Sequence, residues 1–114
     1  MRILFMGTPE FAMNSLKAIY ESGEEIVGVV TTPDKVRGRG STPSPTEVKK
    51  FALEKGLDVY QPQTLKDGAF QDVLDKLTPD LIVVVAYGRI LPEYVINYPK
   101  YGCINSHASI LPKY

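Results

Sequence analysis

The sequence contains very little of what disulfide bridges and metal centres are made from. Its 114 residues include one cysteine, one histidine and no tryptophan. A single cysteine excludes an internal disulfide, which fits a reducing compartment, and we expect a cytoplasmic protein. A histidine without a second histidine or a cysteine pair does not make a zinc site, so we expect no metal.

Long apolar runs and an excess of one charge are missing as well. The longest apolar run, residues 81–87, is far shorter than the roughly 20 residues that cross a bilayer. Met1 leads directly into a strand-like run, so we expect no signal peptide. Thirteen basic side chains balance thirteen acidic ones, so no overall field favours a membrane or nucleic acid. With 44% hydrophobic residues the chain can bury a core, and we expect one domain or part of one.

Apolar runs alternate with amphipathic segments along the chain. The runs are typical of strands that helices cover on both faces, and they lie at residues 2–7, 26–30, 57–60, 81–86 and 102–107. Segments with apolar residues at helical spacing separate them, and these lie at residues 9–21, 45–55, 70–77 and 91–97. The alternation predicts an α/β fold with a doubly wound parallel sheet. Because residues 81–86 are the most β-branched run, we expect them to form the central strand.

One connection differs from the others in length and charge. Residues 31–45 are expected to form a loop, although strand-to-helix connections usually have about 2–6 residues. Five basic and two acidic side chains give residues 31–50 a net charge of +3. Arg39 has a glycine on each side, which would present it freely, and a guanidinium suits phosphate recognition. Charges that simply face solvent explain the pattern equally well at this point.

Asn105 and His107 are the candidates for chemistry. Residues two apart on a strand project from the same face, and these two lie at the carboxyl end of the last expected strand, where open parallel sheets bind ligands. The carboxamide can donate to a developing oxyanion and the imidazole can give or take a proton, so the pair suits acyl transfer. The alternative is a histidine with a purely structural role. Cys103 lies earlier on the same face, and we interpret it as a small buried hydrophobic residue.

The turn after the first expected strand argues against a dinucleotide cofactor. A G-x-G-x-x-G pattern would be required there, and residues 7–10 read Gly-Thr-Pro-Glu instead. The proline removes an N–H that a phosphate would use, and Glu10 would repel the phosphate. We therefore expect neither NAD nor FAD, and we interpret Gly7 as part of a strand-to-helix turn.

Several segments carry a resemblance to a known family. They are residues 3–12, 33–35, 38–40, 60–62, 83–92 and 103–114. The last segment, which contains Asn105 and His107, resembles formyltransferases that use 10-formyltetrahydrofolate. The Gly-Thr-Pro turn at residues 7–9 and the Ala-Tyr-Gly segment at residues 86–88 are similar to the methionyl-tRNA formyltransferase branch of that family.

The resemblance implies a Rossmann-like catalytic fold with strand order 3-2-1-4-5. It implies formyl transfer from 10-formyltetrahydrofolate to the amino group of initiator methionyl-tRNA, in translation initiation. By the family's motif, Asn105 and His107 are catalytic, and Arg39 matches the arginine that a basic loop brings to the acceptor end of tRNA. The folate site, by the same motif, is lined by Ser109, Ile110, Leu111 and Pro112.

The chain departs from the family's pattern in places. Ser41 and Thr42 stand where the family usually has two lysines, which would weaken the grip on tRNA, and Ala108 replaces a glycine. Beyond the position of Tyr114 the family continues with a catalytic aspartate and a carboxy-terminal barrel. We therefore expect residues 1–114 to be the amino-terminal portion of the catalytic domain, inactive alone. An exposed strand edge would open this portion to self-association, whereas we expect the intact protein to be a monomer.

Two other interpretations stay open at this level. One is another folate-dependent formyltransferase that acts on a nucleotide sugar or a ribonucleotide, and the choice of acceptor would separate it from a tRNA-directed enzyme. The other is an α/β module that binds without catalysis.

Overall fold

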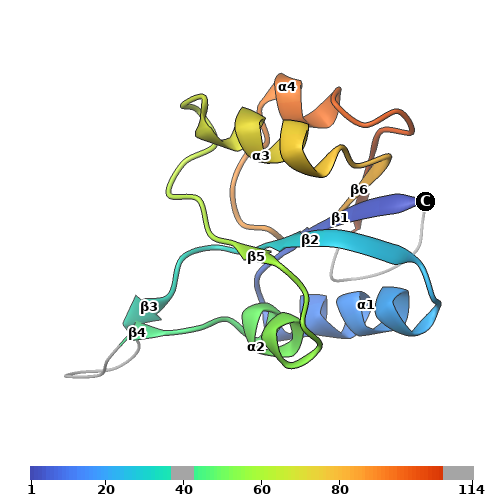
Figure 1. Cartoon of the computed structure of the whole chain (residues 1–114). Coiled ribbons are helices and arrows are strands. Elements are labelled where there is room, and N and C mark those ends of the chain that lie inside the picture. The colour runs from blue at the N-terminus through green and yellow to red at the C-terminus, as the bar shows by residue number, and fades with distance from the viewer. Residues whose placement is uncertain (37–42, 107–114) are drawn as a thin grey trace.

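The main sheet has five parallel strands in the order β5-β2-β1-β6-β7 (Figure 1). The structure is a computed structural model that describes residues 1–36 and 43–106. The strands are β1 Arg2–Gly7, β2 Glu25–Val30, β5 Val59–Tyr60, β6 Leu81–Val85 and β7 Cys103–Ser106. Numbered along the chain as the first to fifth strands of this sheet, they follow the predicted order 3-2-1-4-5.

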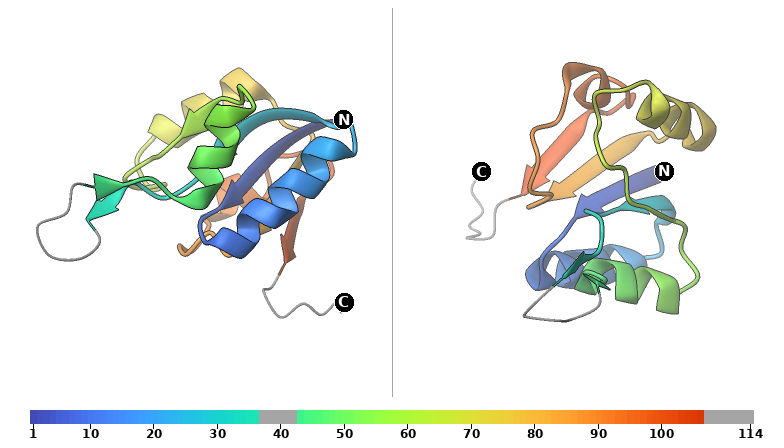
Figure 2. Two further views of the ribbon diagram at one scale, coloured as in Figure 1. Left: turned by 90° about the horizontal axis from the view of Figure 1, so that it is seen from below. Right: turned by 90° about the vertical axis from the view of Figure 1, so that its left-hand side faces the viewer.

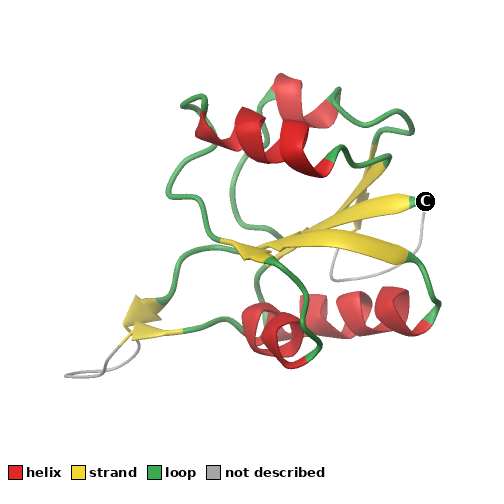
Figure 3. Cartoon of the chain, viewed as in Figure 1, coloured by secondary structure: helices red, strands yellow, loops and turns green. Residues whose placement is uncertain are grey.

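Helices cover both faces of the sheet (Figure 3). They are α1 Glu10–Glu21, α2 Glu47–Glu54, α3 Ala69–Leu77 and α4 Glu93–Ile96. The first two lie on one face, and α3 and α4 lie on the other (Figure 1). This is the predicted doubly wound α/β arrangement, which right-handed crossovers between parallel strands produce. Within the described ranges, no helix is long and apolar enough to cross a membrane.

Strand β1 supplies both cores of the molecule. Successive side chains of a strand point to opposite faces, so Phe5 packs with Leu16 under α1 and α2, whereas Leu4 and Met6 pack with Leu74 under α3. All five side chains are fully buried. The uninterrupted apolar run at the start of the chain is therefore explained by burial on both faces.

The central position in the sheet belongs to β1, and the prediction that residues 81–86 form the central strand was wrong. β6 pairs with β1 on one side and with β7 on the other, so it is an interior strand beside the centre. Apolar β-branched residues indicate burial on both faces, which β1 and β6 share, and they do not encode the position of a strand in the sheet.

The long loop contains a structural element that the sequence did not predict. Its two ends pair as a short antiparallel ribbon, formed by β3 Lys35–Val36 and β4 Pro43–Ser44. Figure 2 shows this ribbon projecting from the body of the sheet, beyond the carboxyl end of β2. Two other predicted elements are shorter than expected, since β5 has two residues and α4 has four.

The chain reverses its direction across the sheet between β1 and β6. The connections after β1 and β2 pass through α1 and α2 on one face, and those after β5 and β6 pass through α3 and α4 on the other (Figure 1). The segments that follow β1 and β6 therefore lead to opposite faces of the sheet. In doubly wound sheets ligands bind at this point, at the carboxyl ends of the strands.

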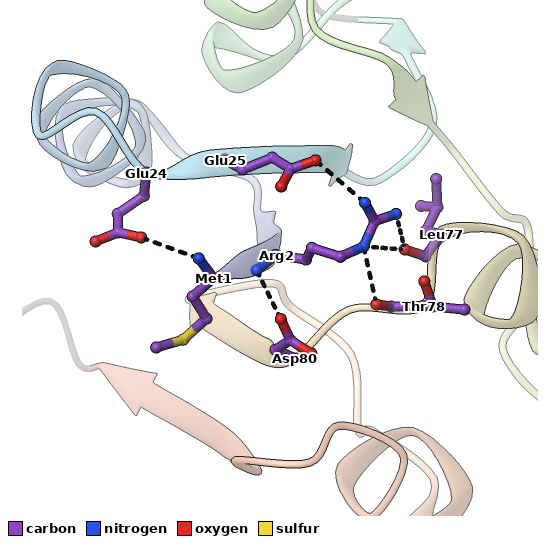
Figure 4. Close-up of polar contacts among 7 residues, drawn as sticks. All are labelled: Met1, Arg2, Glu24, Glu25, Leu77, Thr78 and Asp80. Carbon is purple, nitrogen blue, oxygen red and sulfur yellow. Dashed lines mark hydrogen bonds and ion pairs between the residues drawn. The ribbon is translucent and has the colours of Figure 1, made fainter.

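The amino ends of the strands are fastened by Arg2 (Figure 4). Its guanidinium donates to the carbonyl oxygens of Leu77 and Thr78, with Nε at 3.1 and 3.2 Å, and to Glu25 at 3.1 Å. Its main-chain N–H donates to Asp80 at 2.9 Å. These contacts tie β1 and β2 to the end of α3, on the side of the sheet opposite the carboxyl edge.

Candidate active site

The turn after β6 has a backbone conformation that few side chains adopt. Ala86 has a φ of 49° and Gly88 a φ of 93°, and the left-handed region costs a residue with a Cβ roughly 1–2 kcal/mol. Thr8, in the turn after β1, donates from its hydroxyl to the carbonyl oxygen of Tyr87 at 2.8 Å. The two turns are thus joined where the sheet reverses direction. Strain of this kind persists where the surrounding structure holds it, and it is common at functional sites.

A hollow of about 640 Å³ lies beside this turn. Residues of β6, the following turn, α4 and β7 line it: Val84, Ala86, Tyr87, Gly88, Arg89, Ile90, Leu91, Ile96, Cys103 and Asn105. Its size is within the range of small-molecule sites, about 300–1,000 Å³. The side chain of Ile90 is 93% exposed, so the hollow offers apolar surface that a ligand can cover.

Asn105 lies where the sequence predicted, at the carboxyl end of a strand. It pairs in register with Val84 of β6, and both residues line the hollow. Its side chain is exposed, so the carboxamide is accessible to a bound molecule. The predicted position of Asn105 is therefore confirmed, whereas its catalytic role stays a prediction.

The other predicted site residues lie outside the described ranges. These are His107 of the proposed pair, Arg39 of the basic loop, and the four proposed folate-lining residues Ser109, Ile110, Leu111 and Pro112. The roles assigned to these residues stay predictions.

The turn residues of the hollow were not predicted as site residues. Arg89 donates to the carbonyl oxygens of Pro62 at 3.0 Å and Gln63 at 2.7 Å, and so holds the segment after β5 against the turn after β6. Tyr87 is 1% exposed, and its hydroxyl has no hydrogen-bond partner among the residues that the structure describes. Burial raises the pKa of this phenol, which keeps it protonated. One feature of the sequence could have identified these residues as part of a site: the turn directly follows a fully apolar strand.

Cys103 lies on the same face of β7 as Asn105 and is partly buried. Burial raises the pKa of its thiol, and a thiol that stays protonated is a poor nucleophile. It packs against the core below α3 and α4, as predicted for a small hydrophobic residue, although it is partly buried where full burial was expected. Across residues 1–36 and 43–106, no cluster of three or more histidine, cysteine, aspartate or glutamate side chains could hold a metal ion.

Comparison with known proteins places these features in a family. A family model described as formyl transferase matches residues 1–114. The methionyl-tRNA formyltransferase of Caldanaerobacter subterraneus subsp. tengcongensis is 56% identical over 115 aligned positions, which cover 100% of this chain and 37% of that protein. The methionyl-tRNA formyltransferase of Pelotomaculum thermopropionicum is 54% identical, and the match covers 100% of this chain and 36% of that protein. The chain therefore spans little more than a third of the length of these relatives.

Solved structures agree with the fold. The match with glycinamide ribonucleotide transformylase 1 from Symbiobacterium toebii covers 98% of this chain and 53% of that chain, with a TM-score of 0.67 and 17% identity. The match with phosphoribosylglycinamide formyltransferase from Anaplasma phagocytophilum covers 99% of this chain and 52% of that chain, with a TM-score of 0.68 and 19% identity. Identities this low support the fold and no more. The family model, which matches every residue, shows that the chain belongs to the formyl transferase family.

Proposed function

We propose that this chain is the amino-terminal portion of the catalytic domain of an enzyme that formylates the amino group of initiator methionyl-tRNA. The observation that carries the proposal is the Asn105 carboxamide at the edge of an apolar hollow. It occurs in a chain more than half identical to methionyl-tRNA formyltransferases. Such an enzyme acts in the cytoplasm in translation initiation, and we expect it to be a monomer when intact.

The formyl donor that suits the hollow is 10-formyltetrahydrofolate. Its pterin is a flat ring system, and Ile90, Leu91 and Ile96 provide apolar surface for such a ring. The left-handed turn at Ala86 leaves main-chain groups beside the hollow, where they can pair with the polar edge of the ring. We further propose that residues 109–112 complete this wall.

Asn105 and His107 would act on the carbonyl group of the formyl donor. The methionyl amine forms a bond to the formyl carbon, and negative charge collects on the formyl oxygen. The Asn105 amide and a protonated His107 donate hydrogen bonds to that oxygen. The bond between the formyl carbon and N10 of the folate then breaks, N10 leaves with a proton, and the amine loses one. In this proposal the hollow holds the donor, and the Asn105 carboxamide, which lines the hollow, faces the oxygen on which the charge forms.

The test is formyl transfer by the intact enzyme carrying Asn105→Ala or His107→Ala. Loss of one oxyanion donor lowers kcat by roughly 100- to 1,000-fold. Because both side chains stabilise the same charge, the fold-loss in kcat of the double variant should be far smaller than the product of the two single fold-losses. Asn14→Ala, which removes an exposed carboxamide from α1, is the matched control and should keep full activity. Turnover near the wild-type rate in Asn105→Ala would contradict the assignment.

The acceptor is tested separately. Methionyl-tRNA, a ribonucleotide amine and an amino sugar nucleotide are offered to the same enzyme with the same donor. We expect transfer to methionyl-tRNA alone. Transfer only to one of the small acceptors would refute the tRNA-directed function while leaving formyl transfer intact, and binding of the donor without any transfer would indicate a binding module.

A further inference from the structure

The Thr8 hydroxyl joins the segments that follow three neighbouring strands. It donates to the carbonyl oxygen of Tyr87, after β6, at 2.8 Å, and its oxygen lies 3.2 Å from the hydroxyl oxygen of Thr32, after β2. A hydroxyl carries one proton, so Thr8 accepts from Thr32 while its own proton points at Tyr87. Thr32 is 5% exposed, and its carbonyl oxygen accepts from the Gln61 side chain at 3.1 Å. The Thr8 hydroxyl therefore has a defined direction.

Tyr87 is held at its side chain and at its main chain. Its ring is 1% exposed and packs in the core under α3, which fixes the position of the turn. The hydrogen bond from Thr8 fixes the direction of the peptide group between Tyr87 and Gly88. The preceding residue, Ala86, has a left-handed φ of 49°, which is unfavourable for a residue with a Cβ. Loss of the hydrogen bond would let the turn relax from this strained conformation.

The same turn forms a wall of the hollow. The lining includes the whole stretch 86–91, together with Asn105 from β7. A change in the direction of the peptide group after Tyr87 would displace the residues that follow it, among them Ile90, whose side chain is 93% exposed. Thr8 is not among the described residues that line the hollow. Its influence on a bound molecule therefore passes through the turn.

We propose that Thr8 is a positioning residue that holds residues 86–88 in the conformation that binds the formyl donor. The proposal rests on the proposed function, because it takes the ligand of the hollow to be 10-formyltetrahydrofolate. Main-chain groups at Ala86 pair with the polar edge of the pterin only while the turn keeps its left-handed conformation. A site that is competent in only a fraction of the molecules binds its ligand more weakly by that fraction. The hydrogen bond from Thr8 keeps this fraction high.

The test is binding of 10-formyltetrahydrofolate to the intact enzyme carrying Thr8→Val, which keeps the shape of the side chain and removes its hydroxyl. We expect Kd for the formyl donor to rise roughly three- to tenfold, the range that follows from the loss of one neutral hydrogen bond. KM for the formyl donor should rise by a similar factor, whereas kcat at saturating formyl donor and KM for methionyl-tRNA should stay unchanged. Thr8→Ser retains the hydroxyl and should restore Kd to within about twofold of the wild-type value.

The matched control is Thr31→Val. The hydroxyl oxygen of Thr31 lies 2.8 Å from that of Thr46, and the two residues are 0% and 3% exposed. This pair joins the end of β2 to the start of α2, and neither residue lines the hollow. The variant should lower the melting temperature at least as much as Thr8→Val and leave Kd for the formyl donor unchanged. A rise in Kd as large as that in Thr8→Val would mean that affinity only follows stability, and this result would overturn the proposal.

A second set of variants tests whether Thr8 acts through the strained turn. Glycine adopts a left-handed φ without the penalty that a Cβ brings, so Ala86→Gly removes the tendency of the turn to relax. In this background Thr8→Val should raise Kd by less than about twofold, although it removes the same hydrogen bond. An equal rise in Kd in both backgrounds would show that the hydroxyl acts independently of the turn, and the positioning role would be wrong.

Hydrogen exchange of residues 86–91 in the unliganded enzyme separates this proposal from the proposed function. We expect Thr8→Val to speed exchange in this segment, whereas Thr31→Val does not. If the wild-type enzyme does not bind 10-formyltetrahydrofolate, the proposed function fails, and the exchange rates decide whether Thr8 holds the turn. Unchanged exchange, or an unchanged Kd in an enzyme that binds the formyl donor, would overturn the role of Thr8. Should Thr8→Val lack a cooperative thermal transition, Thr8→Ala removes the same hydroxyl with a smaller side chain, and it must raise Kd for the proposal to stand.

Discussion

At the scale of single residues, Gly7 decides how closely the turn after β1 approaches its neighbours. A Cβ at this position would lie 2.8 Å from the carbonyl oxygen of Val85, and 2.9 Å from both the Ala12 Cβ and a ring carbon of Phe5. The first of these is main chain of the neighbouring strand and cannot turn aside. Gly7 thus allows β1, α1 and β6 to meet where the sheet reverses direction. The sequence predicted a strand-to-helix turn at Gly7, and the close approach of β6 is a finding of the structure.

Gly7→Ala should destabilise the chain by about 1–3 kcal/mol, because the added methyl group must push strand and helix apart. Urea unfolding of the 114-residue chain at low protein concentration measures the change. Gly68→Ala is the control, since a Cβ there meets nothing within 4 Å, and it should change the free energy of unfolding by less than about 0.5 kcal/mol. Equal effects of the two substitutions would contradict the steric explanation.

At the scale of elements, the end of α3 is held by a side chain from another part of the fold. The last carbonyl groups of a helix lack partners within the helix and carry partial negative charge. Arg2 supplies donors to two of them, on Leu77 and Thr78, and Thr78 itself adopts a left-handed φ of 43°. The start of β1 therefore completes the end of α3, although the two are separated by most of the chain.

Arg2→Met should lower the free energy of unfolding by about 1–2 kcal/mol, because it keeps the apolar stem but removes charged donors from the carbonyl groups of Leu77 and Thr78, the first of which is partly buried. Urea unfolding again measures it. The pair with Glu25 has side chains that are 38% and 59% exposed, so Glu25→Gln should cost less than about 1 kcal/mol. A loss in Glu25→Gln as large as that in Arg2→Met would place the stabilisation in the surface pair instead of the helix end.

At the scale of the whole molecule, β7 is an edge strand, since no strand among the described residues pairs with its outer side. β7 is the last strand in the sheet order, and Ile104, on its face toward α1 and α2, is 53% exposed. An edge strand with an apolar residue in solvent can pair with another chain. Self-association of the 114-residue chain stays a prediction, and this edge strand is the reason for it.

The 114-residue chain should therefore form dimers or larger species as its concentration rises, and Ile104→Lys should shift it toward the monomer, because a charge blocks pairing at an edge. Sedimentation velocity over a range of concentrations measures the distribution. Leu53→Lys changes a side chain on α2 that is 57% exposed and lies away from this edge, so it should leave the distribution unchanged. Association that responds equally to both substitutions would point to general apolar contact.

Much of the fold could be predicted from local patterns. Continuous apolar runs predicted β1 and β6, and the apolar spacing of Phe70, Leu74 and Leu77 predicted α3, because burial on a given side imposes a period on the sequence. The order 3-2-1-4-5 came with the family resemblance, and right-handed crossovers are consistent with it. Asn105 was predicted at a ligand edge for the same reason, since the carboxyl end of a strand can be located from the sequence.

Local patterns in the sequence were sufficient to predict the strands of the main sheet, the four helices, the two-sided burial of β1 and the position of Asn105 at a strand end. Other features depend on contacts between residues far apart in the chain and emerge only from the folded structure. These are the central place of β1, the ribbon of β3 and β4, the wall that the turn after β6 forms beside the hollow, and the link from this turn through Thr8 to Thr32. Periodicity records which side of an element is buried, whereas the identity of the neighbour is set by packing and by hydrogen bonds that close only when the chain is folded.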